Sequence, residues 1–313
     1  MNAHIGLAFS VENICFSVFL RDNDLLLLER VGCVQYPFPY DEEKLINTGN
    51  IAALADLIQK KVLAGVENIS DLSISIESNM AVLKRIALPD NFNQFEEDEH
   101  IAWDLSQSLL EPVDNYTYFK TDNIFETEAL KDHLTIAIQK NIVTFLRDLS
   151  KKLGIELANI SVNPLVAEIT LKNVLENHGE GLIALFKIGS TRVESTYLWN
   201  GNYYISHYDK IPTENQAAPG NDYLHAVIKA KIKQMESLFE QFTQTRINTS
   251  RIFVYGNNIE DRFLQKLQEN LSVVAFRLNP LQNIEKSEYL QNHLPSIEEA
   301  TKFVEAIGVV LDQ

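Results

Sequence analysis

Few residues of this chain have the types and spacing that a chemical reaction requires. Its seven histidines are scattered, and no two of them have the spacing on one helix that holds a metal ion. The sequence has no Gly-x-Ser-x-Gly turn that would expose a nucleophilic serine, and no GxxxxGK loop of the kind that binds phosphates. A zinc enzyme, a serine hydrolase and a P-loop nucleotidase are therefore not predicted.

The Gly-Ser-Thr turn at 189–191 is the best candidate for chemistry. It follows a buried apolar strand and precedes two more strands, in the segment 182–208. The segment 4–30 repeats this pattern without a gap when Ala8 is aligned with Lys187, 179 residues further along the chain. A pattern that occurs once in each half predicts a duplicated domain.

The elements around these turns are those of a layered α/β protein. In the first half, strand patterns at 4–9, 13–20 and 24–31 precede a helix pattern that begins at Ile51 and a further strand at 72–77. The order β-β-β-α-β predicts a sheet that is covered by a helix.

The middle of the chain predicts a subdomain inserted into the first domain. Residues 82–154 show a strand, a helix with acids in its first turn, two strands and an amphipathic helix. Trp103 is expected in the core of this unit, with a contact to a partner as the alternative. We therefore expect a first domain over 1–178 and a second over 179–313, which form one rigid body around a central cleft. A final helix over 296–312 begins at a capping-box spacing and is expected to pack back toward the first domain.

The composition indicates a soluble globular protein without a nucleic-acid partner. Among 313 residues, 43 acids exceed 27 bases, for a net charge of −16, which opposes binding to a phosphate backbone. This charge suits a basic peptide or simply a well-solvated surface. Cys15 and Cys33 lie in apolar strand patterns, which predicts buried thiols without a disulfide in a reducing cytoplasm. No signal peptide and no apolar run of roughly 18–20 residues is present, so the chain is not expected to cross a membrane by itself.

Two β-β-β-α-β halves that each open with a hairpin follow the plan of the actin-like (ribonuclease H-like) fold. The sequence resembles the PilM family of type IV pilus assembly proteins, which is related to FtsA. IGLAFSVENICFSVF is similar to the family's first phosphate loop, LIALFKIGSTRVESTYLWNG to its second, and RIFVYGNNIED to its adenosine loop. VLKRIALPDNF and EDEHIAWDLSQSLLEPVDNYTYFKT resemble its inserted subdomain. The likeness covers nearly the whole chain, although no single motif is intact.

The resemblance implies a nucleotide cleft between two turns, each with an aspartate that handles magnesium. Here the two aspartate positions hold Ala8 and Lys187, and the acidic position of the linking strand holds Asn163. Losing both carboxylates argues against a magnesium-dependent ATPase, because the metal needs hard oxygen ligands and Lys187 repels a dication. The candidate residues of this degenerate cleft are Ser10, Lys187, Gly189, Ser190, Thr191, Gly256 and Asn257.

Two roles remain open for Lys187. It could replace the metal and pair directly with a phosphate of ATP or ADP, which gives nucleotide binding without hydrolysis or with altered metal chemistry. It could instead pair with an acid and close an empty cleft, which gives a pseudo-ATPase that uses no cofactor and no metal. Because actin-like folds often polymerise, a filament-forming protein or another homo-oligomer remains a third possibility.

For a scaffold, the resemblance implies docking on the cytoplasmic tail of a single-pass inner-membrane protein (PilN-like) in a type IV pilus or type II secretion-like assembly. The protein would then lie in the cytoplasm, at the inner face of the inner membrane, through this partner. In the PilM family the tail lies in a groove between the inserted subdomain and the first core domain. The strand 82–88 and the helix 95–110 are therefore the expected groove elements.

Overall fold

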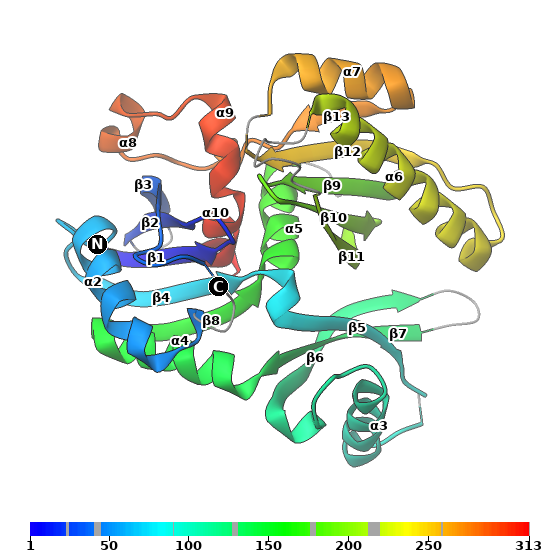
Figure 1. Cartoon of the computed structure of the whole chain (residues 1–313), viewed down its shortest axis with the longest axis horizontal. Helices are drawn as coiled ribbons and strands as arrows, with labels where there is room; N and C mark the ends of the chain where they lie inside the picture. The colour runs from blue at the N-terminus through cyan, green and yellow to red at the C-terminus, as the bar shows by residue number, and fades with distance from the viewer. Residues whose placement is uncertain are drawn as a thin grey trace.

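The computed structural model describes residues 1–22, 25–40, 45–89, 91–126, 131–175, 180–211, 220–257 and 259–312. Asn258, in the segment that resembles an adenosine loop, lies outside these residues, as does the first residue of the strand predicted over 24–31. Figure 1 shows two large lobes, each built on a five-stranded sheet, and a smaller unit below the second lobe.

The first sheet has the strand order β3-β2-β1-β4-β8. Its two hairpins are antiparallel, whereas β4 pairs in parallel with β1 and β8. The strands are β1 (Asn2–Phe9), β2 (Ile14–Asp22), β3 (Leu25–Val34), β4 (Ile69–Ile76) and β8 (Glu156–Val162). Ile5, Leu7 and Phe9 alternate onto one face, where they share a core with α2 (Ile51–Lys61) and α4 (Lys140–Leu153). The sheet is therefore covered by helices as the periodicity predicts.

The second sheet repeats this topology in the order β11-β10-β9-β12-β13. Its strands are β9 (Leu182–Ile188), β10 (Arg192–Trp199), β11 (Asn202–Lys210), β12 (Thr249–Gly256) and β13 (Val274–Arg277). Two helices cover one face, α6 (Asn221–Thr243) and α7 (Asp261–Leu271). Both sheets place an antiparallel hairpin before a parallel strand, with Ala8 on β1 and Lys187 on β9. The two halves therefore repeat one sheet topology, as the repeated sequence pattern predicts.

Helices α5 (Asn163–Val174) and α10 (Val304–Leu311) stand side by side between the two sheets (Figure 1). Two buried hydroxyls anchor α10: Ser17 Oγ donates to the Ala306 carbonyl at 2.6 Å and Thr170 Oγ1 to that of Val304 at 2.7 Å. The end of the chain therefore packs onto the first sheet.

The C-terminal segment differs from the single helix predicted over 296–312. It forms α9 (Ile297–Ala300), a 3-10 turn and then α10, after the short helix α8 (Glu288–Asn292). The capping box is confirmed, because Ser296 Oγ accepts from the Glu299 amide while the Glu299 side chain accepts from the Ser296 amide.

The inserted unit is smaller than the predicted range 82–154. Its antiparallel sheet has the order β5-β7-β6 and carries one helix. The elements are β5 (Ala81–Ala87), α3 (Gln94–Ser106), β6 (Tyr116–Glu126) and β7 (Lys131–Gln139). The boundary at 154 is wrong, because Phe145, Leu146 and Leu149 of α4 lie in the core of the first sheet. A strongly amphipathic helix fits either unit, and its sequence does not say which one it covers.

Arg85 ties the inserted sheet to the second sheet. Its Nε donates to the Tyr204 carbonyl at 3.0 Å, and Nη2 donates to the Tyr203 carbonyl and, at 2.8 Å, to Asn123 Oδ1. The guanidinium also lies over the rings of Phe125 and Tyr204, 5.7 and 5.2 Å from their centroids. The inserted unit is therefore held against the second lobe by the guanidinium of Arg85, a planar group whose N–H donors point in fixed directions.

Trp103 is not a core residue, contrary to the prediction. Its side chain is 60% exposed, and that of Phe95 is 68% exposed. Helix α3 instead buries Ile101 and Leu105. The error arises because Trp103 and Phe95 share a helix face, and helical spacing does not show whether that face is covered.

The two cysteines form a disulfide, contrary to the predicted free thiols. Cys15 on β2 lies directly opposite Cys33 on β3, with a Cα–Cα distance of 4.0 Å. Their register depends on a bulge between Val18 and Phe19, which a sequence pattern does not reveal. The argument from free thiols to a reducing compartment therefore loses its support.

Candidate functional site

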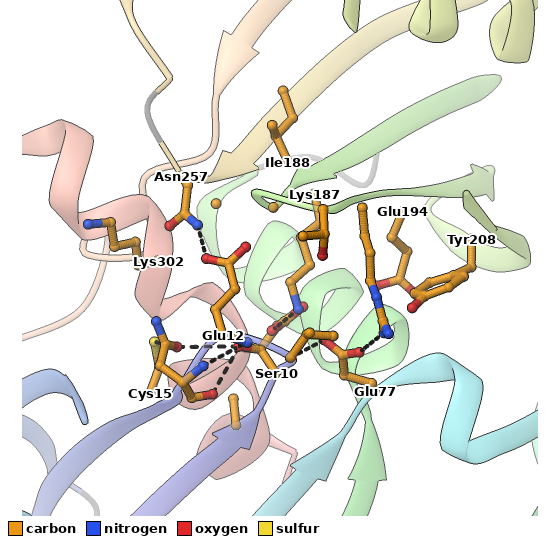
Figure 2. Close-up of a pocket in the computed structure, with 18 residues that line it drawn as sticks. Ser10, Glu12, Cys15, Glu77, Lys187, Ile188, Glu194, Tyr208, Asn257 and Lys302 are labelled. Carbon is orange, nitrogen blue, oxygen red and sulfur yellow. Dashed lines mark hydrogen bonds and ion pairs between the residues drawn. The ribbon is translucent and has the colours of Figure 1, made fainter. Parts of the chain in front are cut away.

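A small cavity lies where the turns of both halves meet (Figure 2), with a volume of about 60 Å³. Six of the seven predicted cleft residues line it: Ser10, Lys187, Gly189, Thr191, Gly256 and Asn257. The seventh, Ser190, contributes its backbone amide to the same place. The structure therefore brings all the predicted residues together, because both turns lie at the same edge of their sheets.

The side chain of Ser10 forms hydrogen bonds with the backbone of the first turn. Its hydroxyl donates to the Asn13 carbonyl at 2.9 Å and accepts from the amides of Glu12 and Asn13, both at 3.2 Å. A serine that bonds its own turn in this way holds the chain in a tight bend. The amides of Glu12 and Asn13 are therefore bonded within the turn by a hydroxyl that a glycine at this position would lack.

Two carboxylates from the first half take further donors of the cleft. Glu77 accepts from the Val11 amide at 2.9 Å and from Arg192 Nη1 at 2.8 Å. Glu12 accepts from the Ser190 amide and from Asn257 Nδ2, the second contact being drawn in Figure 2. Both turns therefore present their amides to carboxylates of the chain itself.

Glycines allow the second half to come this close. A Cβ on Gly189 would lie 3.0 Å from Glu12 Oε1. Gly256, with a φ of +107°, would place a Cβ 2.4 Å from the Ile188 carbonyl oxygen. Only glycine fits this close approach at a positive φ, so the two loops of the second half are held in contact.

Lys187 pairs with an acid, as the second of its two predicted roles requires. Its Nζ lies 2.7 Å from Glu305 Oε2, with side chains that are only 17% and 6% exposed. Tyr255 donates its hydroxyl to the other carboxylate oxygen at 3.2 Å. Burial opposes the charge, but the carboxylate of Glu305, followed by those of Glu77 and Glu194, raises the pKa of Lys187 above its ordinary value. The ammonium is therefore charged and paired with Glu305.

Asn163 stands apart from the cavity. Its Oδ1 accepts from Ser75 Oγ at 2.5 Å, and its Nδ2 donates to the Phe9 carbonyl at 3.1 Å. The side chain is completely buried at the start of α5. Asn163 therefore joins β1 and β4 to the helix rather than facing a ligand.

Sequence reasoning missed the three carboxylates Glu12, Glu77 and Glu305, and a signal existed for two of them. Glu77 directly follows β4, where side chains that serve a cleft gather in parallel sheets. Glu305 is the one acid within the otherwise apolar run of α10. Glu12 had no such signal. Within the described part of the chain, no group of three or more His, Cys, Asp or Glu side chains is arranged to hold a metal ion.

Glu194 is a buried carboxyl that should make the stability depend on pH. It is 6% exposed, and among the described residues its Oε1 has no hydrogen-bond partner. Burial, opposed by Lys187, raises the pKa of Glu194 from 4.5 to about 7. Between these values the folded state holds a proton that the unfolded state has lost, so the free energy of unfolding falls as the pH rises.

Glu194→Gln should abolish this decrease in the free energy of unfolding with rising pH. The free energy of unfolding of the variant, relative to the wild type, should increase by about 2 kcal/mol from pH 5 to pH 8, since one pKa unit corresponds to about 1.4 kcal/mol. Urea titrations of both proteins at the two pH values measure the change. A difference between the two proteins that is the same at pH 5 and pH 8 would contradict the raised pKa.

Comparison with solved structures decides the fold. A chain of the PilM–PilN type IV pilus biogenesis complex superposes with a TM-score of 0.76 over 99% of this chain and 98% of its own length, at 13% identity. A Bacteroides thetaiotaomicron protein of unknown function, described as having an actin-like ATPase fold, has a TM-score of 0.52 over 90% and 93% of the two chains, at 14% identity. This protein has the actin-like ATPase fold. The sequence resemblance to PilM is thereby confirmed at the level of the fold.

A third similar structure comes from a secretion system. The cytoplasmic domain of EpsL, an inner membrane component of the type II secretion system of Vibrio cholerae, has a TM-score of 0.50 over 83% and 84% of the two chains, at 9% identity. No protein-family model and no curated protein sequence matches the chain. The likeness is therefore carried by the arrangement of the elements and not by conserved motifs.

Proposed function

We propose that this protein is a non-hydrolysing cytoplasmic scaffold that binds the cytoplasmic tail of an inner-membrane protein in a type IV pilus or type II secretion-like assembly. The observation that carries the proposal is the full-length superposition on a chain of the PilM–PilN complex, inserted subdomain included. The similarity to the cytoplasmic domain of EpsL, an inner membrane component, supports the same kind of role.

A groove for such a tail lies between the inserted sheet and the first domain. Its volume is about 530 Å³, within the range of about 300–1,000 Å³ that is usual for binding pockets. It contains apolar side chains from both units, listed here: Ile46, Met80, Val82, Leu109, Leu110, Tyr116 and Ile142. Apolar anchors of an extended peptide would be buried there.

Only parts of the two expected elements, the strand 82–88 and the helix 95–110, line this groove. The strand β5 contributes Ala81 and Val82 to the lining, and the segment 108–111 after α3 contributes further residues, whereas no residue of α3 itself lines the groove. Glu111 adds a carboxylate to this lining. With the net charge of −16, this favours a tail that has apolar anchors and a basic flank.

The proposed location depends on this partner. Among the described residues, no helix is both long and apolar enough to span a bilayer. We infer that the tail, and not the chain itself, holds the protein at the inner face of the inner membrane.

The cleft supports the non-hydrolysing part of the proposal. Ala8 and Lys187 stand at the two positions where the resemblance expects aspartates, and Lys187 is engaged by Glu305. The cavity of about 60 Å³ is far below the several hundred Å³ that a nucleotide-sized ligand occupies. In this arrangement the cleft favours no nucleotide.

Leu110→Asp should weaken binding of the tail by about tenfold or more. Leu110 is fully exposed on the wall of the groove, so burying an apolar anchor against it contributes at least about 1.4 kcal/mol, which is tenfold in affinity. Calorimetric titration with the cytoplasmic-tail peptide of any single-span membrane protein whose gene neighbours that of this chain measures the change. Leu294→Asp, at another leucine that is 51% exposed, is the matched control and should bind as the wild type does.

Two outcomes of this titration would reject the scaffold. Binding that strictly requires ATP contradicts a nucleotide-independent dock. Failure of every membrane protein encoded nearby to bind contradicts the partner. An equal loss in Leu110→Asp and Leu294→Asp would instead show that the groove is not where the tail binds.

Nucleotide binding is the second candidate, because the three cations Lys187, Arg192 and Lys302 line the cavity, beside the four acids Glu12, Glu77, Glu194 and Glu305. For the scaffold we expect no thermal shift with ATP or ADP, with or without magnesium. A nucleotide-binding protein would instead gain about 2.7 kcal/mol at a hundred times the dissociation constant, and this gain would be lost in Lys187→Met. Sedimentation with and without ATP tests filament formation in the same samples.

A further inference from the structure

An exposed side of α3 combines aromatic rings with an acidic side chain. Phe95, Glu99 and Trp103 follow one another at intervals of four residues, which places them on one side of the helix. The side chains of Phe95 and Trp103 are 68% and 60% exposed, whereas Ile101 and Leu105, on the other side, are buried. We refer to Phe95, Glu99 and Trp103 as the α3 face. Large aromatic side chains that are exposed together are typical of an interaction surface.

The ring of Trp103 is held in place by its neighbours. Its centroid lies 5.8 Å from that of His100, which in turn lies 5.6 Å from that of Phe92. A side chain that is already packed loses less conformational entropy on binding, and tryptophan and arginine are enriched among the residues that anchor interfaces. The α3 face therefore offers a preformed aromatic anchor.

The charge of α3 indicates a basic partner. The helix contains five acids and no lysine or arginine, a formal charge of −5. Glu97 and Asp104 form ion pairs with Lys120 and Lys84 of the inserted sheet. Glu99 forms no ion pair with any residue that the structure describes. Its carboxylate on the α3 face is therefore free to pair with a cation of another molecule.

Helix α4 carries the complementary charge. It contains four bases and one acid, a formal charge of +3 in a chain whose net charge is −16. Lys140, Thr144, Arg147 and Lys151 are exposed and lie three or four residues apart, so they share one side of the helix, which we refer to as the α4 face. Lys151 lies 3.5 Å from Asp148. Within the described part of the chain Arg147 has no ion-pair partner.

We propose that the α3 face of one copy of this chain binds the α4 face of a second copy. Figure 1 shows the two helices apart from each other within one chain, so each face is free to meet its complement on another copy. Arg147 of the second copy can pair with Glu99 while its guanidinium lies over the ring of Trp103, since Glu99 and Trp103 are one helical turn apart. The inference is independent of the proposed tail binding, because none of these three residues lines the groove.

The two helices also match in length. Helix α3 has 13 residues and α4 has 14, which corresponds to about 20 Å each at a rise of about 1.5 Å per residue. Like charges oppose contacts between two α3 faces or between two α4 faces, so the complementary contact joins different elements of the two copies. A contact of one helix from each copy is small, so the association should be weak and visible only at high protein concentration.

Sedimentation velocity at increasing protein concentration tests this contact, and the wild type should sediment faster as the concentration rises. Glu99→Arg and Arg147→Glu should each weaken the association by about tenfold or more, because like charges then face each other. Trp103→Ala removes the aromatic anchor and should weaken the association to a similar extent. The control Glu240→Arg, at an exposed residue of α6, changes the net charge as Glu99→Arg does and should associate as the wild type does.

The double variant Glu99→Arg/Arg147→Glu exchanges the charges of the two faces and should restore the association that each single variant loses. A mixture of the two single variants should also associate. An effect of net charge alone predicts the opposite for Glu99→Arg, because this change makes the chain less negative and would strengthen association. A wild type that stays monomeric at every concentration, or a double variant as weak as the single variants, would overturn the proposal. A monomeric wild type that loses tail binding in Trp103→Ala would assign the α3 face to the tail instead.

Discussion

Removing either partner of the Lys187–Glu305 pair should lower the free energy of unfolding by about 3–5 kcal/mol, because it leaves a buried charge without its counter-ion. Both side chains are largely buried, and the Nζ–Oε2 distance is 2.7 Å. Glu305→Leu removes the ion-pair partner of the Lys187 ammonium and leaves the carboxyls of Glu77 and Glu194 as the acids that act on it, and Lys187→Met leaves the buried carboxylate of Glu305 without its ion-pair partner. Urea unfolding of each variant measures the loss, with an unchanged dependence on denaturant as the check on two-state behaviour.

The double variant Lys187→Met/Glu305→Leu separates this pair from ordinary packing. With both charges gone no unpaired ion remains, so the double variant should be more stable than either single variant. The hydroxyl of Tyr255 then loses its acceptor, which should cost about 1–3 kcal/mol. If the losses of the two single variants simply add in the double variant, the two residues are not coupled and the buried ion pair is disproved.

The pair also shows why the fold could be predicted while the site could be predicted only in part. The fold was accessible because apolar periodicity repeats at an offset of 179 residues, which aligns Ala8 with Lys187. Such periodicity is a local property, and two equal patterns build two equal sheets. The turns could be placed for the same reason, because they end the first strand of each sheet.

The partners of those turns depend on contacts between distant segments. Glu12 lies 178 residues from Ser190 and 245 residues from Asn257 along the chain, and the packing of the two halves brings the three residues together. No periodicity or spacing in these segments records that packing. The sequence of α10 could show Glu305 as an acid within an apolar helix. It could not show that Lys187 is the partner of Glu305.

The wrong predictions for the two cysteines and for α4 also concern contacts that local sequence patterns do not determine. The spacing of Cys15 and Cys33 along the chain is compatible with several registers, and a bulge in the hairpin selects the one that brings them face to face. The amphipathic pattern of α4 identifies an apolar face correctly, but which sheet it covers is decided by tertiary packing. Local patterns therefore predict elements, whereas their neighbours follow from topology.

Gly308→Ala should lower the free energy of unfolding by about 3 kcal/mol or more, since overpacking that moves a backbone reaches or exceeds the usual cost of about 1–3 kcal/mol. A Cβ on Gly308 would lie 2.1 Å from the Val166 carbonyl oxygen and 2.5 Å from Thr170 Oγ1. Neither atom is the end of a flexible side chain, because one is the backbone of α5 and the other is held by its bond to the Val304 carbonyl. Helix α10 must therefore move away from α5.

This movement should be visible in the cleft as well as in stability. Glu305 lies three residues before Gly308 on α10, so a displaced helix should lengthen its contact with Lys187 and reduce the coupling energy of the pair. Gly220→Ala is the matched control, because a Cβ there meets no atom within 4 Å and its backbone φ of −65° is ordinary. It should change the free energy of unfolding by less than about 1 kcal/mol. Equal unfolding curves for Gly308→Ala and Gly220→Ala would show that α5 and α10 do not require this close approach.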